Sequence, residues 1–372
     1  MTLTKALGSQ PNLNQSKFEF LIWKFIQIFS LLLFIIFFIF KRKEILYVGD
    51  IGGSFADHYM SFISFTTSLI MITEPVLNYQ LYIEFQKFTK LFLDNLDESF
   101  PNYFKRKEIN QEISLKIGKI VIGYIIAFII CELKRFFHSM FAEQARNFAI
   151  VFLFVTILIQ IKVWHIVYQM LIIEKFLLII QKLMKQINHN IYENLEFNLV
   201  TYNKAIRRRY KKVIELYKIM QHLVELLNKI GIPQLTIFLT IKLFLMGEFY
   251  WIALVTMHEQ IQMNVTYTLL ASSFQKILVL LIQAYIAEQI KKNNQKVIRQ
   301  IHRQKLINNV HQPLTEHFIY VIMMTKIKIY PCGIMKIEYS TIREMATDIV
   351  KTLFIFIQLI PLYFNLYEMY AS

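Results

Sequence analysis

The sequence is poor in charged residues and in residues that interrupt helices. Only 18% of its 372 residues are charged, and it holds nine glycines and seven prolines. A soluble domain of ordinary composition has about a quarter of its residues charged. The chain has two cysteines, Cys131 and Cys332, too few for a disulfide framework or a thiolate metal cluster. The composition therefore argues against a soluble domain and against a disulfide-rich scaffold.

Motifs that carry chemistry are also scarce. The Gly-rich stretch at residues 49–53 lacks the lysine and the strand-to-helix context of a phosphate-binding loop. The nine histidines are scattered, and His165 is interpreted as a packed or interfacial side chain. No grouping of nucleophile, base and orienting residue can be recognised. We therefore expect no enzymatic activity, no cofactor and no metal site.

Apolar residues are abundant and gathered in long blocks. The chain is 55% hydrophobic, with 33 phenylalanines. Its apolar blocks have close to the length of about 20 residues that a helix needs to cross a hydrocarbon core of roughly 30 Å. A kink is expected at Glu74-Pro75 because proline interrupts helical hydrogen bonding. The sequence predicts an all-α polytopic membrane protein with seven spanning helices, at residues 20–40, 59–83, 117–133, 148–170, 235–257, 266–287 and 345–364.

The distribution of cations predicts the orientation of these helices. Most lysines and arginines fall in the segments after the second, fourth and sixth spans, and cytoplasmic loops are the ones enriched in these residues. This places the N-terminus inside and the C-terminus outside, opposite to a G-protein-coupled receptor. Basic loops kept on the cytoplasmic side account for the net charge of +15, so this charge does not indicate that the protein binds nucleic acid. The sequon at Asn264 then falls in a short extracellular loop and is a candidate glycosylation site.

The cytoplasmic segments carry helical patterns of their own. Apolar residues recur every three or four positions after the fourth span and again before the fifth, which is typical of helices that pack along a seam. We expect the fourth, fifth and sixth helices to continue into the cytoplasm as a bundle. The second seam comprises Val213, Leu216, Met220, Leu223, Leu227 and Ile230.

Several polar residues lie within the predicted spans. Such residues are costly in lipid and normally face the bundle interior, a partner or water. They are Lys162, Lys242, Glu248, Lys276, Gln283, Asp348, Lys351, Thr352 and Gln358. Snorkelling to an interface is an open alternative for Lys162 and Lys242. Lys242 and Glu248 are too far apart along the helix to pair, so each needs another partner, whereas Asp348 and Lys351 are spaced to neutralise each other.

The last span is preceded by a basic segment, residues 326–344, which we call the arm. It enters the last helix without an evident turn. The arm contains Lys328, Cys332, Gly333, Ile334, Met335, Ile337 and Glu338. These residues and the last helix resemble the insect gustatory receptors, which have a Cys-Gly pair, a hydrophobic-acidic stretch, Thr-Tyr, five apolar residues and Gln-Phe. In the helix the apolar run and Gln358 match, but Lys351-Thr352 replaces Thr-Tyr, and Leu359 replaces the phenylalanine.

The resemblance implies a ligand-gated cation channel in the plasma membrane of chemosensory neurons. It implies a homo- or heterotetramer with related receptor subunits, in membrane lipid, that binds a small-molecule tastant and conducts cations. Residues 1–325 would hold helices one to six and the ligand pocket, and residues 326–372 the anchor arm and pore helix. The candidates are Asp348, Lys351, Thr352, Phe354 and Gln358 for the pore, Cys332, Gly333 and Glu338 for the anchor, and Trp164, Tyr168, Tyr250, Trp251 and Tyr267 for the pocket.

Other classes of membrane protein remain open at this point. An odorant-receptor-type channel would share the topology, although the Cys-Gly arm and the basic sixth loop favour a gustatory type. A secondary transporter would show internal repeats and broken helices, and Glu74-Pro75 is the only break of that kind in the sequence. A G-protein-coupled receptor would need the opposite orientation.

Overall fold

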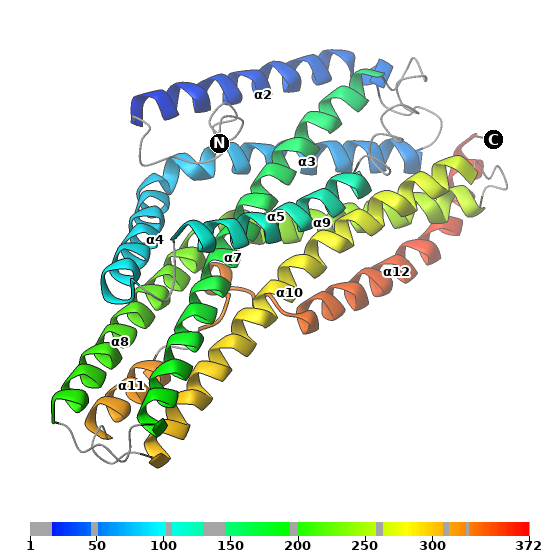
Figure 1. Cartoon of the computed structure of the whole chain (residues 1–372). Helices are drawn as coiled ribbons and strands as arrows, with labels where there is room; N and C mark the ends of the chain where they lie inside the picture. Colours follow the sequence, from blue (N-terminus) through cyan, green and yellow to red (C-terminus); the bar gives the residue numbers. More distant parts are fainter. Residues whose placement is uncertain are drawn as a thin grey trace.

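The computed structural model describes residues 17–45, 51–101, 106–128, 146–193, 200–257, 263–307, 312–324 and 327–371. The regular elements in these ranges are all helical, which confirms the predicted all-α class (Figure 1). They are α2 (Lys17–Ile45), α3 (Ile51–Leu77), α4 (Tyr79–Ser99), α5 (Arg106–Phe128), α7 (Arg146–Glu193), α8 (Val200–Lys229), α9 (Ile232–Met257), α10 (Met263–Ile307), α11 (Gln312–Met324), the 3-10 turn η4 (Pro331–Gly333) and α12 (Tyr339–Ala371).

Two helices run almost the full length of the molecule. α7 has 48 residues and α10 has 45, so each is about 70 Å long, more than twice the thickness of a hydrocarbon core. In Figure 1 one end of the molecule holds α8, α11 and the ends of α7 and α10, while α2, α3, α5 and most of α9 lie toward the other end. The segments Gln160–His189 and Ile232–Tyr250 are long and apolar enough to cross a membrane.

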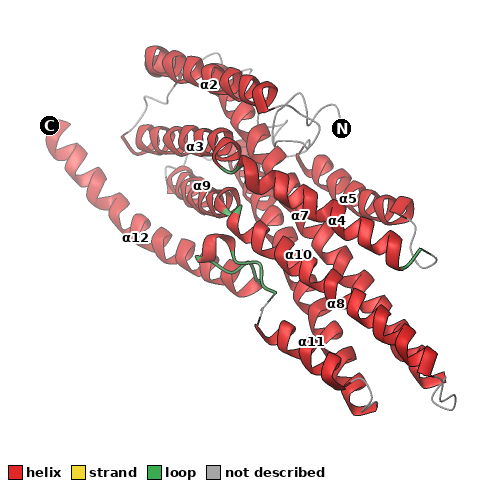
Figure 2. Ribbon diagram, turned by 90° about the vertical axis from the view of Figure 1, so that its left-hand side faces the viewer, coloured by secondary structure: helices red, strands yellow, loops and turns green. Residues whose placement is uncertain are grey.

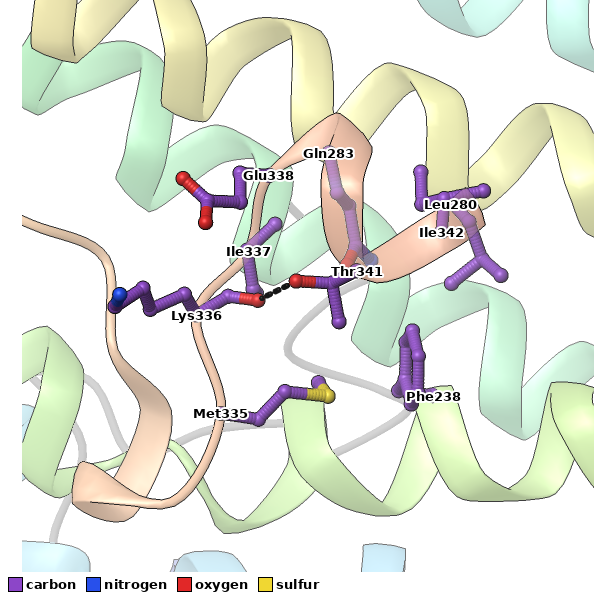
Figure 3. Close-up of a pocket in the computed structure, with 9 residues that line it drawn as sticks. All are labelled: Phe238, Leu280, Gln283, Met335, Lys336, Ile337, Glu338, Thr341 and Ile342. Atoms are coloured by element: carbon purple, nitrogen blue, oxygen red, sulfur yellow. Dashed lines mark hydrogen bonds between the residues drawn. The ribbon is translucent and has the colours of Figure 1, made fainter. Parts of the chain in front are cut away.

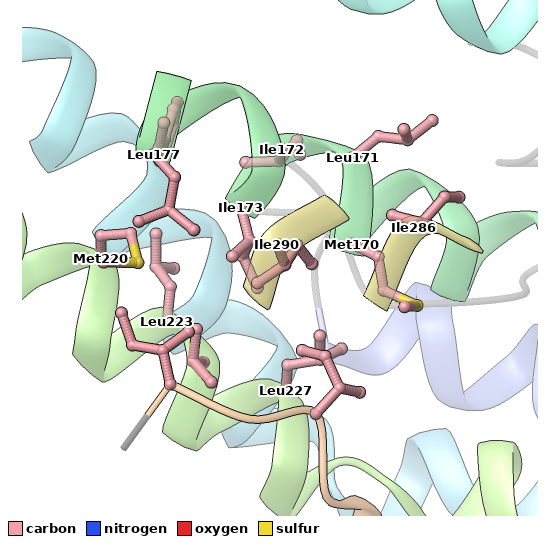
Figure 4. Close-up of a cluster of buried hydrophobic side chains, with 14 of the residues drawn as sticks. Met170, Leu171, Ile172, Ile173, Leu177, Met220, Leu223, Leu227, Ile286 and Ile290 are labelled. Atoms are coloured by element: carbon pink, nitrogen blue, oxygen red, sulfur yellow. The ribbon is translucent and has the colours of Figure 1, made fainter. Parts of the chain in front are cut away.

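The core is densest where α7, α8 and α10 meet. The seam on α8 is buried, with each of its six apolar residues at most 4% exposed, as the sequence predicts. Met220, Leu223 and Leu227 of α8 face Ile173 and Leu177 of α7, with Ile290 of α10 beside them (Figure 4). Packing of this kind holds helices together where apolar spacing follows the helical period. α4 closes another side of this bundle, since Phe92 stacks on Phe176 with ring centroids 3.8 Å apart.

The predicted second span consists of two helices. α3 continues through Pro75 to Leu77, and α4 leaves in another direction after Asn78 (Figure 1). Asn78 N still donates to Glu74 O at 2.9 Å across the bend. Proline cannot donate to the carbonyl four residues earlier, and the bend lies three residues after it. The predicted interruption is therefore real, but the apolar run at residues 59–83 extends over both helices.

The arm makes a turn that the sequence did not reveal. Cys332 and Gly333 have φ angles of 52° and 69°, the left-handed conformation that favours glycine. The turn lies against the junction of α8 and α9: a Cβ on Gly231 would be 2.5 Å from Pro331 Cα. Asn228 fixes the arm there, because its Nδ2 donates to Lys328 O at 2.9 Å and its Oδ1 accepts from Tyr330 N at 2.7 Å. The expectation of a direct entry into the last helix is wrong.

Candidate functional site

A buried ion-pair network joins α9 to α10. Glu248 is 1% exposed, and its carboxylate accepts hydrogen bonds from Ser272 Oγ at 3.0 Å and Ser273 Oγ at 2.7 Å. Lys276 forms an ion pair with the same carboxylate. A buried charge is tolerated when it is paired and its remaining lone pairs are hydrogen-bonded. The partners that Glu248 was expected to need are thus supplied by the neighbouring helix.

A second ion pair joins α9 to α12. Lys242 Nζ lies 2.8 Å from Asp348 Oδ2, with the two side chains 27% and 54% exposed. The predicted pairing of Asp348 with Lys351 is therefore wrong, because the carboxylate turns toward α9 and Lys351 stays exposed. Lys242 gains a specific partner, although its ammonium group is not buried.

A third polar cluster lies where α3, α4 and α7 meet. Glu74 is 2% exposed and accepts hydrogen bonds from Asn78 Nδ2 and from the Tyr82 hydroxyl, both at 2.9 Å. Lys162 Nζ is 3.5 Å from the same carboxylate, and its side chain is 4% exposed. Snorkelling of Lys162 to an interface is therefore excluded. The sequence offered a signal for Glu74, because Asn78 and Tyr82 lie on the same helical face, but Glu74 was interpreted only as part of a break.

The pore candidates lie on a helix that is covered on one side only. Met345 and Ile349 are buried against the bundle, whereas Val350, Phe354 and Ile355 are 51%, 63% and 57% exposed. Lys351 and Gln358 are also exposed. Figure 2 shows α12 at the edge of the molecule, diverging from the bundle toward the C-terminus.

One of the pore candidates, Thr352, forms a hydrogen bond within its own helix. The Thr352 hydroxyl donates to Asp348 O at 2.8 Å, a bond within one turn that removes its only proton from other contacts. Lys351 and Gln358 are seven residues apart, which is close to two helical turns. They therefore share a face.

The aromatic pocket candidates are dispersed. Trp164 is half-buried against the core, and Tyr168, one turn further along α7, is 44% exposed. Tyr250 is half-buried on α9. Trp164, Tyr168 and Tyr250 are not among the residues that line the pocket between the arm, α9 and α10. Trp251 lies on α9 and Tyr267 on α10, but their side chains fall outside the described set.

Two further predicted positions can be placed on the backbone or the surface. α10 begins at Met263, so Asn264 lies in its first turn and not in the preceding loop, and its glycosylation stays a prediction. Cys332 is exposed and unpaired with another cysteine, and partial burial raises the pKa of its thiol. Cys131 lies outside the described residues. Within the described ranges, three or more His, Cys, Asp or Glu side chains do not gather into a metal site.

A pocket opens where the arm crosses α9 and α10 (Figure 3). It contains about 260 Å³ of space that protein does not fill, part of it open to solvent. Its lining consists of Phe238, Leu280, Gln283, Met335, Lys336, Ile337, Glu338, Thr341 and Ile342. The anchor candidate Glu338 is therefore at this pocket, whereas Cys332 and Gly333 form the preceding turn.

Comparison with known proteins finds matches over nearly the whole chain. The profile of the 7tm chemosensory receptor family matches residues 6–361. The fold is similar to the insect olfactory receptor OR5 from Machilis hrabei in complex with eugenol, with a TM-score of 0.62, 9% sequence identity and 96% of each chain covered. A second structure of that receptor matches with a TM-score of 0.55 at the same identity and coverage. A search of curated proteins found no match. The chain belongs to the seven-transmembrane chemosensory receptor family.

Proposed function

We propose that this receptor is a gustatory-type, ligand-gated cation channel in which α12 of each subunit lines a shared central pore. The observation that carries the proposal is the exposed face of α12. This face carries Lys351 and Gln358 about two helical turns apart, with Phe354 and Ile355 between them. A lysine and a glutamine facing lipid at membrane depth would be costly. Water in a pore, or the same helix of another subunit, satisfies both.

The assembly proposed is a homo- or heterotetramer with related subunits in the plasma membrane of chemosensory neurons. The N-terminus lies in the cytoplasm and the C-terminus outside, which agrees with the excess of cations on α8 and the neighbouring loops. Residues 1–325 then form the ligand-binding bundle with its cytoplasmic extensions, and residues 326–372 form the anchor and pore helix. The clamp between Asn228 and the arm supports an anchoring role for the arm.

A small tastant is the proposed ligand. An insect olfactory receptor of similar fold has been solved with eugenol, which supports a small-molecule pocket within the helices of this chain. The aromatic candidates for that pocket remain Trp164, Tyr168, Tyr250, Trp251 and Tyr267. The positive charge of Lys351 would repel cations in the pore. The proposed cation channel therefore requires the Asp348 carboxylate to lie near Lys351 and offset its charge in the conducting state.

The test is a recording of currents from cells that express the receptor, alone and with related subunits, during perfusion of tastants. We expect ligand-evoked cation currents with single-channel steps. Gln358→Ala should alter permeation or ligand sensitivity because it removes a polar group from the pore face, whereas Gln289→Ala on α10 serves as a control. Currents unchanged by Gln358→Ala would remove Gln358 from the pore. A C-terminal tag accessible only after permeabilisation would overturn the topology.

An odorant-receptor-type channel is the second candidate. The observation that favours it is the similarity of fold to an olfactory receptor over 96% of both chains. The two candidates differ in ligand class and in dependence on a shared co-receptor subunit. Responses to volatile odorants only in the presence of such a subunit would select the odorant type.

A further inference from the structure

Polar residues recur every seven positions along the exposed face of α12. Glu344, Lys351 and Gln358 are all exposed, and Asn365 continues the series in the sequence. Seven residues are close to two helical turns and about 10 Å along the helix axis, so the first three lie in one row. A repeat of seven is typical of parallel helices that pack around a common axis. Glu344 therefore begins a polar row that includes the pore candidates Lys351 and Gln358.

Glu344 has no partner among the described residues of its own chain. Its side chain is exposed, and it forms no ion pair or hydrogen bond with another described residue. Asp348, one turn further along, is held by Lys242 of α9. Met345 and Ile349 bury the opposite side of α12 against the bundle. The Glu344 carboxylate is therefore available to whatever lies on the exposed side of α12.

Symmetry limits what can face this row in an assembly. In a cyclic assembly each residue lies at the same height as its own copies. Glu344 of one subunit then meets Glu344 of the others, and Lys351 meets Lys351. Like charges in a dry contact repel each other, and a charge that faces lipid is costly. Water on the symmetry axis accommodates both rings of charge, so the row favours a water-filled path.

We propose that Glu344 of each subunit contributes to a ring of carboxylates at the cytoplasmic mouth of the pore and makes this mouth selective for cations. This role rests on the channel function and the orientation given under the proposed function. Rings of acidic side chains select cations in channels, and a charged opening raises the local concentration of counter-ions. The ring lies about 10 Å to the cytoplasmic side of Lys351, so outward-moving cations meet it before they reach the lysine.

A contact between copies is the competing explanation for an exposed glutamate. Arg343 is also exposed and lies about 100° around the helix from Glu344, so the same arginine of a neighbouring subunit can approach the carboxylate. Such a pair would stabilise the tetramer and leave little free charge at the mouth. Neutralising Glu344 then weakens assembly, whereas a carboxylate ring at the mouth acts on ion flow.

Single-channel recordings of the full-length receptor in excised patches test the proposal. Glu344→Gln should reduce the outward unitary cation current roughly twofold and the inward current less, because the carboxylates lie at the cytoplasmic entrance. The difference should largely disappear at about 1 M cytoplasmic salt, where the screening length is about 3 Å. Glu344→Lys should reduce the outward current further and shift the reversal potential in a salt gradient toward that of chloride. Glu225→Gln, at an exposed glutamate of α8, is the matched control and should conduct as the native chain does.

A thiol at position 344 gives a second readout that depends on charge. Glu344→Cys should conduct like Glu344→Gln. Reaction with an anionic thiosulfonate reagent should restore the outward current, whereas a cationic reagent of similar size should lower it further. The native chain, whose Cys332 is exposed, is treated in parallel to measure any effect at that cysteine.

The outcomes separate this proposal from the channel function on which it rests. An outward current unchanged in both Glu344→Gln and Glu344→Lys would overturn the role of Glu344 and leave the channel intact. A loss of tetramer in size-exclusion chromatography shared by Glu344→Gln and Arg343→Gln would identify an ion pair between copies and overturn the role as well. A native chain without ligand-evoked current would overturn the channel function, and the selectivity assigned to Glu344 with it.

Discussion

Two ion pairs start from α9 within two turns of each other and have opposite surroundings. Glu248 is 1% exposed and holds Lys276 and two serines of α10. Lys242 holds Asp348 of α12 in an environment where that aspartate is 54% exposed. A buried pair cannot be opened without leaving a charge uncompensated, whereas an exposed pair exchanges its partner at little cost. α9 is therefore held firmly to α10 by the Glu248–Lys276 pair and weakly to α12 by the Lys242–Asp348 pair, which we call the latch.

Glu248→Gln should have the largest effect on stability. The neutral amide leaves the largely buried Lys276 (12% exposed) without a counter-charge, and loss of one partner of a buried ion pair destabilises a protein by about 3–5 kcal/mol. We expect a large drop in the melting temperature of the detergent-purified receptor, and little change for Asp348→Asn. Adding Lys276→Met to Glu248→Gln should recover most of the loss. Equal melting of Glu248→Gln and Asp348→Asn would remove the contrast between the two pairs.

Leu223→Ala and Ile355→Ala extend the contrast to apolar side chains. Leu223 is fully buried on the α8 seam, so its truncation should cost about 2–5 kcal/mol. Ile355 is 57% exposed on α12, and its truncation should change the free energy of unfolding of a single subunit by less than about 0.5 kcal/mol.

The same pair of variants also reports on assembly. If the exposed face of α12 meets other copies, Ile355→Ala should lower the fraction of tetramer in size-exclusion chromatography while Leu223→Ala lowers total folded protein. A tetramer fraction unaffected by Ile355→Ala and by Phe354→Ala together would contradict packing of copies through this face.

What the sequence predicted correctly was information that is local along the chain. The seam from Val213 to Ile230 follows the helical period, so its burial could be inferred without knowing its partner helix. The same holds for the exposed polar positions of α12. The need of Glu248 for an external partner followed from spacing alone.

What the sequence could not predict depends on contacts between distant segments. Lys242 and Asp348 are 106 residues apart, and the closer Lys351 was the natural expectation. The left-handed turn at Cys332 and Gly333 comes directly after Pro331, which packs against Gly231 about 100 residues earlier in the chain. Glu74 was within reach of sequence reasoning through Asn78 and Tyr82, but its pairing with Lys162 depends on how α3 and α7 pack.

The smallest change in stability should come from the latch, and its effect should appear in gating. Under the proposed channel function, Asp348 is held by Lys242 at rest and is needed beside Lys351 during conduction. Lys242→Gln should therefore leave the melting temperature almost unchanged, while it raises basal current or lowers the half-maximal tastant concentration by a few-fold. The reason is that freeing Asp348 removes a contact specific to the resting state, and a ligand needs less differential affinity to open the pore.

Asp348→Asn separates this latch from a role in conduction. It breaks the same contact, but it also leaves Lys351 without its offsetting carboxylate, so basal opening should rise while single-channel cation conductance falls. The exchange Lys242→Asp with Asp348→Lys restores the latch but places a second cation beside Lys351, and it should combine native gating with low conductance. If Lys242→Gln and Asp348→Asn had the same effects on gating and on conductance, Asp348 would act only through its ion pair with Lys242. α12 would then carry its permeation chemistry further along, at Gln358.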